Sequence, residues 1–445
     1  MKELWIIALI TICFRIQVNG QQYATKIDSL IQKAASLKRF NGSILVCKNG
    51  RIVFEKAYGY QNIERKIANT PATIFQVGSM TKQFTAAVVL KLAEQHKLSI
   101  DDKISKYFPN LKRGDEISIK NLLTHTSGLS EIFRDTSYLN ENKQTCISKK
   151  KLLSFFINSP LYFDPGTQYS YCNSGYVLLR LIIEKVTQKS YEQVIRDFIL
   201  KPLKMTHSGF DFAGLKSKQK AVGYIKFSIA ESISSKPWDS TFTYSAGSLY
   251  STANDLYLWH QGLLSKKILT KESLAKAYTP FMEGYGLGCW IDTFYQKQVI
   301  SHGGNIEGFT SYFGRIEEDD VCVILLNNIY NREIESISTA ILAILYDQPY
   351  HFFEEIKVNA ELLEKYVGIY EINPNYHIKI TRTDNRLFAR VQNEPVVEIF
   401  ADKENSFFVK EEDTRIKFIT NAGDKTYRLV FYKGLNSKTG DRLLK

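Results

Sequence analysis

The residues VGSMTK at positions 77–82 decide how this sequence is interpreted. They lead into the run Thr81 to Gln95, whose apolar residues recur at the spacing of one helical face. Positions i and i+3 near the start of a helix lie on one face, so we predict that Ser79 and Lys82 are neighbours. A lysine in a partly dry pocket can lose its charge and accept the serine proton. The helix N-terminus also favours the negative charge that develops at a reacting centre.

The Ser-x-x-Lys pattern alone is not specific, because it occurs twice more, at residues 148–151 and 217–220. Both of these copies lie in hydrophilic, lysine-rich stretches and are predicted to be solvated surface. The copy at Ser79 differs because the apolar stretch Ala86 to Ala93 follows it and anchors it in a core. Context therefore selects Ser79 as the candidate nucleophile.

A second motif, Tyr171-Cys172-Asn173, precedes another predicted helix, Gly175 to Thr187. A tyrosine close to a lysine can be deprotonated and relay a proton to a leaving group. An asparagine amide can hold a substrate carbonyl and contact the lysine. With 26 tyrosines in the chain, a single Tyr-x-Asn is more often structural than catalytic.

A third motif is the segment SHGGN at residues 301–305. Two glycines in a strand let the backbone approach a ligand closely. The N–H groups of this strand could point at a carbonyl oxygen beside the N–H of Ser79, and each such donor is worth about 3 to 4 kcal/mol of barrier. As an isolated fragment, His-Gly-Gly is more often a turn than a site.

Taken together and in this order, the three motifs resemble the serine β-lactamase and penicillin-binding-protein family, in its class C β-lactamase branch. The resemblance covers residues from about 24 to 346. Several connecting stretches share it, namely residues 40–43, 121–129, 246–251 and 304–309. It implies an α/β fold in which an antiparallel β-sheet is flanked by helices and joined by a helical subdomain, with the site between them.

The resemblance also implies the roles of individual residues. Ser79 would be the nucleophile, Lys82 its activating partner and Tyr171 a proton relay, and the sequence leaves open whether Lys82 or Tyr171 is the acylation base. The oxyanion hole would consist of the backbone N–H groups of Ser79 and Asn305. The substrate-binding residues would be Asn173, His302, Gly304 and Asn305.

One position departs from the family pattern. The third motif of a β-lactamase usually opens with a lysine that binds the substrate carboxylate, whereas His302 is neutral or weakly charged at pH 7. This favours an esterase or peptidase over an efficient antibiotic-degrading enzyme. A Lys-Thr-Gly does occur at residues 438–440, where we interpret it as a turn in the C-terminal region.

The two ends of the chain differ from the part between them. Residues 1–20 contain a lysine, an apolar run and a small residue at Gly20, which predicts a secretory signal peptide and export to the periplasm or the extracellular space. The apolar run is too short for a stable membrane span, so an uncleaved anchor is the minority interpretation. Residues 21–350 form the predicted hydrolase domain. Residues 351–445 contain repeated short strands that predict a small all-β barrel, similar to a lipocalin-like domain.

Charge, cysteine and histidine patterns exclude several function classes. The formal net charge of +12 comes from scattered lysines and arginines, so we predict no nucleic-acid partner. The six cysteines form no disulfide framework and are predicted to be mostly buried free thiols. No metal-ligand spacing occurs among the cysteines and histidines, so neither a metal nor a cofactor is predicted. His125 is predicted to be structural.

The sequence thus predicts an exported hydrolase that works through an acyl-enzyme on Ser79. The expected substrates are small peptides, amides or esters, such as D-amino-acid peptides derived from peptidoglycan. A true β-lactamase is the first alternative, and a catalytically weak penicillin-binding or envelope-binding protein is the second. The sequence makes no prediction of the oligomeric state.

Overall fold

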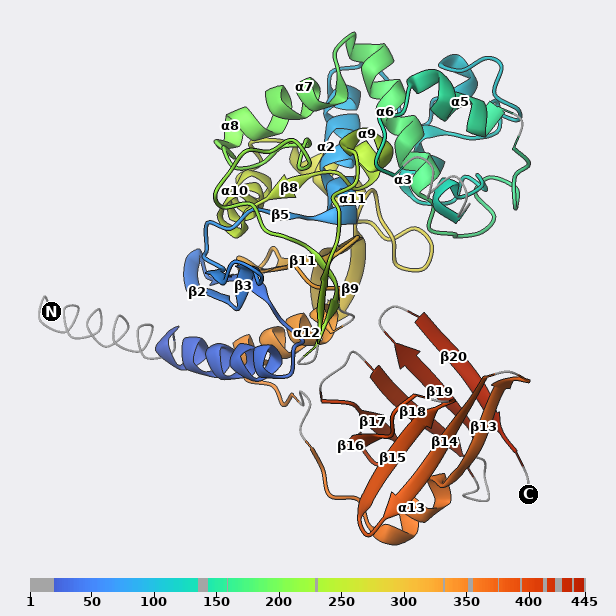
Figure 1. Cartoon of the computed structure of the whole chain (residues 1–445). Coiled ribbons are helices and arrows are strands. Elements are labelled where there is room, and N and C mark those ends of the chain that lie inside the picture. Colours follow the sequence, from blue (N-terminus) through green and yellow to red (C-terminus); the bar gives the residue numbers. More distant parts are fainter. Residues whose placement is uncertain are drawn as a thin grey trace, which may run out of the picture. The chain divides into compact units, whose positions relative to one another are not determined.

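The computed structural model describes residues 20–134, 143–157, 159–228, 231–330, 333–350, 355–374, 376–392, 394–410, 414–420, 426–433 and 436–443 (Figure 1). The predicted signal segment, apart from Gly20, lies outside the described residues. Within the described ranges, the helices are all too short or too polar to cross a membrane. Contacts divide the chain into two compact units. The first contains Asn41–Ile225 and Ile233–Ile329, and the second contains Lys26–Phe40, Lys226–Ser232 and Tyr330–Lys445.

The first unit is organised by a six-stranded antiparallel sheet in the order β2-β1-β12-β11-β10-β9. Its strands are β1 (Gly42–Lys48), β2 (Arg51–Tyr58), β9 (Trp290–Phe294), β10 (Lys297–Ile306), β11 (Phe309–Ile316) and β12 (Val321–Asn327). Side chains of β11 and β12 are buried along their whole length, so both faces of the sheet centre are covered. At the hairpin between β1 and β2, Asn49 and Gly50 both have positive φ, the geometry that a two-residue hairpin turn requires.

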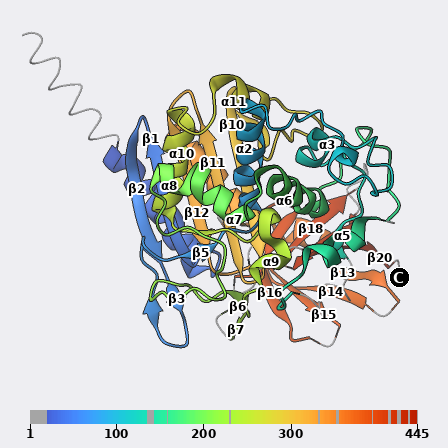
Figure 2. The same cartoon turned by 90° about the horizontal axis from the view of Figure 1, so that it is seen from above.

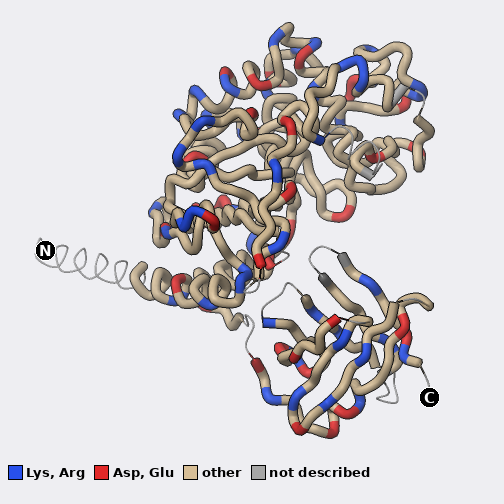
Figure 3. The backbone as a smooth tube through the Cα atoms, viewed as in Figure 1, with Lys and Arg blue, Asp and Glu red and all other residues tan. Residues whose placement is uncertain are grey.

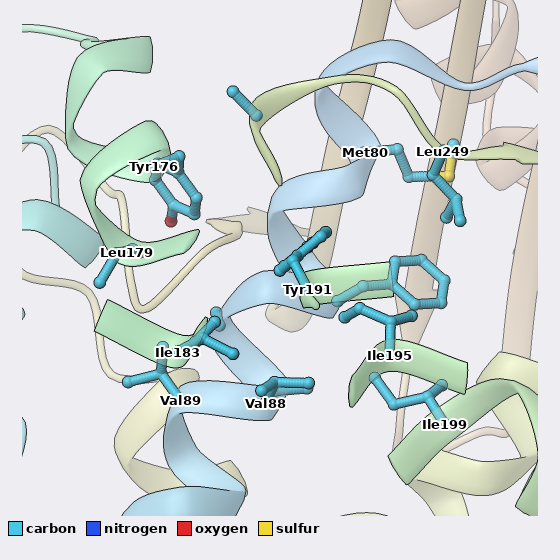
Figure 4. Packing of buried hydrophobic residues seen from close by; sticks show 14 of the residues in the cluster. Met80, Val88, Val89, Tyr176, Leu179, Ile183, Tyr191, Ile195, Ile199 and Leu249 are labelled. Carbon is cyan, nitrogen blue, oxygen red and sulfur yellow. The ribbon is translucent and has the colours of Figure 1, made fainter. Parts of the chain in front are cut away.

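Helix α2 (Thr81–Glu94) is the centre of the helical part, and buried side chains surround most of its circumference. A helix that is buried on all sides belongs inside a domain rather than on its surface. In Figure 4, Val88 and Val89 of α2 lie among Ile183, Tyr191 and Ile195 of the neighbouring helices.

Other helices complete this unit around α2. Helix α10 (Ala253–Leu264) contacts β1 and β12 (Figure 2), whereas α6 (Asn173–Thr187) and α7 (Tyr191–Ile195) contact α2. The shorter helical elements are η1 (Gly78–Met80), η2 (Ile104–Lys106), α3 (Ile119–Leu123), η3 (Ile132–Arg134), α5 (Lys149–Ile157), η4 (Arg196–Leu200), α8 (Lys201–Leu203), α9 (Ser240–Thr243), η5 (Tyr244–Ala246) and α11 (Lys271–Ala277). The short strands are β3 (Tyr60–Asn62), β4 (Ile67–Ala68), β5 (Phe75–Gln76), β6 (Tyr224–Phe227), β7 (Ser232–Ser234) and β8 (Tyr250–Ser251). The predicted sheet flanked by helices is confirmed.

The second unit contains most of the helix at residues 20–36, together with α12 (Ile334–Leu345), α13 (Ala360–Tyr366) and a closed eight-stranded antiparallel barrel. The barrel strands are β13 (Gly368–Asn373), β14 (Tyr376–Thr383), β15 (Arg386–Val391), β16 (Val397–Lys403), β17 (Ser406–Phe408), β18 (Thr414–Thr420), β19 (Thr426–Lys433) and β20 (Asn436–Arg442). Alternate side chains of these strands form a separate apolar core, as along the i, i+2 positions of Ile378 and Ile380. The predicted small barrel is confirmed.

One prediction about the barrel is wrong. Residues 438–440 form part of strand β20, where Thr439 pairs with Val430 of β19, and do not form a turn. The strand escaped detection because its sequence, NSKTGDR, lacks the apolar alternation that marks the other strands. Its partner strands on both sides supply the pairing that fixes it as the closing strand of the barrel.

The described cysteines follow the expectation from the sequence. The five described cysteines are free, and all are buried except Cys146. Cys13 lies outside the described residues. Lysines and arginines are interspersed with acidic residues along the described backbone of each unit (Figure 3).

Candidate active site

Ser79 lies on the short helical turn η1, between strand β5 and helix α2. The preceding Gly78 has a φ of 54°, and a Cβ atom added there would lie 2.8 Å from the backbone nitrogen of Asn305. A glycine is required at this point because the backbone is left-handed and two segments touch. The turn directs the Ser79 hydroxyl toward Lys82, one helical turn later, whose Nζ lies 3.1 Å from Ser79 Oγ.

The Lys82 side chain is fully buried. Besides the Ser79 hydroxyl, its Nζ contacts Asn173 Oδ1 at 2.8 Å and the carbonyl oxygen of Ala246 at 2.7 Å. Burial lowers the pKa of Lys82 to about 7, and the carboxylate of Glu131 opposes this shift. A large fraction of Lys82 is therefore neutral near pH 7. A neutral amine can donate to the amide and the carbonyl while its lone pair accepts the serine proton.

Tyr171 completes the contacts of the nucleophile. Its hydroxyl is hydrogen-bonded to Ser79, and Lys82 Nζ lies 4.9 Å from the centre of its ring. Burial raises the pKa of Tyr171 well above the usual value, so the phenol keeps its proton at neutral pH. This direction is opposite to the one that proximity to a lysine suggested, because burial dominates and the nearby carboxylate of Glu131 acts in the same direction.

His125 packs beneath Tyr171, with ring centroids 4.2 Å apart. The His125 ring is buried and also contacts Tyr176 and Tyr285. Its Nδ1 accepts a hydrogen bond from the backbone N–H of Cys172 at 3.0 Å. Burial and the nearby Lys82 hold the pKa of His125 well below the usual range, so the ring is neutral. Both contacts hold the segment that carries Tyr171, which is compatible with the structural role predicted for His125.

Glu131 was missed by the sequence analysis. Its carboxylate accepts hydrogen bonds from the backbone N–H of Asn173 at 2.5 Å and from the Asn173 side-chain amide at 3.3 Å. The second bond orients the amide so that its oxygen faces Lys82. Glu131 lies two positions after the stretch 121–129 that resembles the family, and this proximity was the available signal.

His302 has a buried ring, only 2% exposed, on strand β10. Its Nδ1 lies 2.5 Å from the Gly303 carbonyl oxygen, and its Nε2 lies 2.9 Å from the Tyr285 hydroxyl. Because a carbonyl can only accept, Nδ1 carries the proton and Nε2 accepts from Tyr285. Burial, followed by the charge of Lys82, lowers the pKa of His302 to about 3. The ring is therefore neutral and offers no charge to a substrate carboxylate.

Gly304 holds strand β10 against the segment that carries Ser79. A Cβ atom at Gly304 would lie 1.9 Å from the Val77 carbonyl oxygen, which also accepts a hydrogen bond of 2.8 Å from Ser311 Oγ. This contact brings the backbone of the next residue, Asn305, beside Gly78. The backbone of Asn305 is thus placed next to the nucleophile turn, while its side chain is exposed.

The arrangement has the parts that acyl transfer requires. A hydroxyl nucleophile contacts a buried amine that is largely neutral at pH 7, and the amine is positioned by an amide that a carboxylate orients. A protonated phenol contacts the same hydroxyl and can donate to a leaving group. The structure therefore brings together the side chains of Ser79, Lys82, Tyr171 and Asn173, with the backbone of Asn305 beside them.

Comparison with known proteins gives matches over most of the chain. The family described as "Beta-lactamase" matches residues 27–345, and the "Domain of unknown function (DUF3471)" matches residues 354–441. The chain is 33% identical over 293 residues to "Putative penicillin-binding protein PbpX" of Bacillus subtilis (strain 168), covering 66% of this chain and 71% of that protein. It is 29% identical over 342 residues to "Protein flp" of Staphylococcus aureus (strain MW2), covering 73% of this chain and 66%, just under two thirds, of that protein.

The solved structure of an octameric penicillin-binding protein homologue from Pyrococcus abyssi shares the fold. It superposes with a TM-score of 0.69 at 26% identity, and the match covers 93% of this chain and 99% of that one.

Proposed function

We infer that this chain, which belongs to the β-lactamase family, is a serine hydrolase that forms an acyl-enzyme on Ser79. The observation that carries the proposal is the contact of 3.1 Å between Ser79 Oγ and the buried Nζ of Lys82, whose pKa burial lowers to about 7. An amine with this pKa can accept a proton at neutral pH and return it later, as a general base must.

In the first step, Ser79 Oγ attacks the substrate carbonyl carbon while neutral Lys82 accepts the hydroxyl proton. The backbone N–H groups of Ser79 and Asn305 are the proposed donors to the oxyanion. The tetrahedral intermediate then expels the amine or alcohol. Tyr171 donates its phenolic proton to that leaving group, and the proton on Lys82 replaces it. Water attacks the acyl-enzyme in the second step, which restores Ser79 and releases the acid.

Lys82, and not Tyr171, is the proposed acylation base. Burial shifts the two pKa values apart, toward neutrality for Lys82 and away from it for Tyr171. A tyrosinate at pH 7 would need a free energy that the site does not supply, whereas neutral Lys82 is abundant. Tyr171 is therefore suited to act as an acid.

The proposed substrates are small amides, esters or D-amino-acid peptides, including fragments of peptidoglycan. His302 supports this class because it is neutral and both of its ring nitrogens are engaged within the protein. A substrate whose binding depends on a carboxylate would miss the lysine that β-lactamases usually place there. Export to the periplasm or outer medium is proposed from the pattern of residues 1–20.

The test is to incubate the mature protein with a labelled penicillin and, separately, with a p-nitrophenyl ester. Intact mass and product release are followed for the wild type, for Ser79→Ala and for the matched control Ser148→Ala, which alters the exposed Ser-x-x-Lys copy. The adduct and turnover should vanish only in Ser79→Ala. Activity that survives in this variant would overturn the mechanism. An adduct without turnover would favour a penicillin-binding protein, and rapid penicillin turnover would favour a β-lactamase.

A further inference from the structure

A second cluster of reactive side chains lies where β1, α10 and the turn before β12 meet. Cys47 comes from β1, His260 from α10 and Asp320 from the turn between β11 and β12. Cys47 Sγ lies 3.8 Å from His260 Nε2, and His260 Nε2 lies 2.7 Å from Asp320 Oδ1. Cys47 Sγ lies 3.9 Å from Asp320 Oδ1. All three ligand-type atoms fall within 4.8 Å of one another.

We propose that Cys47, His260 and Asp320 bind a divalent transition metal ion of the zinc class. Thiolate, imidazole and carboxylate are the three ligand types that zinc takes in proteins. Metal–ligand bonds of about 2.0 to 2.3 Å in a tetrahedron separate the ligand atoms by about 3.3 to 3.6 Å. The Sγ of Cys47 has to move inward by a few tenths of an ångström. The His260–Asp320 pair has to open by somewhat more than half an ångström.

The metal ion would reach the cluster from the side of Asp320, and its fourth ligand would bind from the same side. The Asp320 side chain is 24% exposed, whereas that of His260 is fully buried. Asp320 ends a run of four acidic residues at positions 317–320, in which Glu317 is paired with Lys266, and Glu318 and Asp319 are paired with Lys297. Asp320 is therefore the carboxylate of this run that faces the cluster. A metal ion can therefore enter along Asp320 and keep one water molecule as its remaining ligand.

The protons that Cys47 and His260 carry can be accounted for on metal binding without another reactant. The metal ion displaces the thiol proton of Cys47, which goes to solvent. The proton on His260 Nε2 moves to Nδ1, an atom that has no hydrogen-bond partner among the described residues and is free to change state. Each metal ion bound thus releases one proton.

Arg315 is the group that opposes a cation here. Its buried guanidinium lies on β11, opposite Cys322 of β12, and its charge acts on both Cys47 and His260. Replacement of one proton by a doubly charged metal ion adds one positive charge to the cluster. The carboxylates of Asp320 and Glu317, which also act on His260, offset part of that charge, and Glu317 is itself paired with Lys266.

Such a metal ion would join three segments that are far apart along the chain, so its effect is on stability and not on the chemistry at Ser79.

In the proposed experiment, the full chain is treated with a chelator, dialysed and titrated with Co²⁺ and, separately, with Zn²⁺. The variants are Cys47→Ala, His260→Gln and Asp320→Asn. Cys322→Ala is the matched control, because it removes a buried thiol opposite Cys47 in the β1–β12 ladder.

We expect the wild type and Cys322→Ala to bind one Co²⁺ with thiolate-to-cobalt charge-transfer absorption, and Zn²⁺ to raise their unfolding midpoint. Cys47→Ala should lose the absorption and the shift in midpoint. Circular dichroism identifies any variant that fails to fold. Asp320→Asn changes a partly exposed position, so this variant should fold and bind Co²⁺ more weakly than the wild type. Absence of stoichiometric binding to the folded wild type would overturn the proposal. Binding that persists in both Cys47→Ala and His260→Gln would do the same.

Discussion

Two buried basic residues in the first unit, Lys82 and Arg315, differ in the hydrogen-bond partners that the fold provides. Lys82 has three oxygen atoms within hydrogen-bond distance. By contrast, two guanidinium nitrogens of Arg315 have no hydrogen-bond partner among the residues that the structure describes, and the third donates to the Tyr278 hydroxyl. A buried lysine can discharge by losing a proton, which arginine cannot do in a protein. The first position can therefore move protons, and the second can only supply a fixed positive charge.

The largest expected effect concerns the reaction rate. Lys82→Met removes the proposed base, and acylation by a p-nitrophenyl ester should slow by roughly 10² to 10⁴-fold, the usual contribution of a general base. Arg315→Met should leave the rate within about twofold, because Arg315 lies outside the site. Single-turnover acylation kinetics measure both values. Equal losses in the two variants would remove the distinction between the two cations.

The next effect concerns stability as a function of pH. The pKa of Lys82 is about 7 in the folded protein against 10.5 as its ordinary value, so the unfolded chain binds more protons between these limits. The free energy of unfolding should therefore rise with pH from 7 to 10.5. This one group contributes about 5 kcal/mol across that window and nothing further below pH 7. Denaturant titrations at several pH values should show a shallower slope in Lys82→Met, and an unchanged slope would contradict the assignment.

A smaller effect concerns the pH profile of acylation. The rate should increase through pH 7 as Lys82 loses its proton and then remain level, because the pKa of Tyr171 is far higher. Glu131 opposes the lowering of the Lys82 pKa, so Glu131→Gln should move the midpoint to lower pH. The same variant keeps the size of the side chain. If the pH midpoint of acylation moves upward or stays in place, the charge of Glu131 does not raise the pKa of Lys82, and its role is to orient Asn173.

The smallest expected effect is that of Arg315→Met on stability. The substitution removes two buried nitrogens that have no hydrogen-bond partner within the described part of the chain, and it also removes the Arg315 donor to the Tyr278 hydroxyl. Replacing a poorly paired buried charge by an apolar side chain is often neutral or stabilising, so a change within about 1 kcal/mol is expected. Urea unfolding measures it. A loss of several kcal/mol would mean that Arg315 has a structural function that its contacts do not reveal.

The sequence predicted the elements whose signal is local. The apolar runs of strands β1, β2, β11 and β12 end at turn residues such as Asn49-Gly50, so these strands can be located from the sequence alone. Ser79 and Lys82 are one helical turn apart, so their contact follows from helix geometry alone. By contrast, strand β20 is polar and becomes a strand only through its neighbours in the barrel.

The parts of the site that sequence reasoning missed depend on the tertiary structure. Glu131 meets Asn173 across 42 positions of the chain, and no periodicity predicts that contact. The protonation of Tyr171 depends on how much water the folded protein removes, which the motif does not encode. The separate cluster proposed as a metal site also gave no pattern in the sequence, because Cys47, His260 and Asp320 come from distant segments.

Closure of the barrel by the pairing of β13 with β20 has a consequence for how this region can be rearranged genetically. Tyr370 near its beginning pairs with Arg442 near its end, so the chain enters and leaves the barrel at neighbouring strands. A segment with adjacent ends behaves as a cassette, since it can be deleted, transplanted or circularly permuted with a short connector. Recombination could therefore add such a barrel to a hydrolase, or remove it, without changing the path of the chain within the barrel or within the hydrolase.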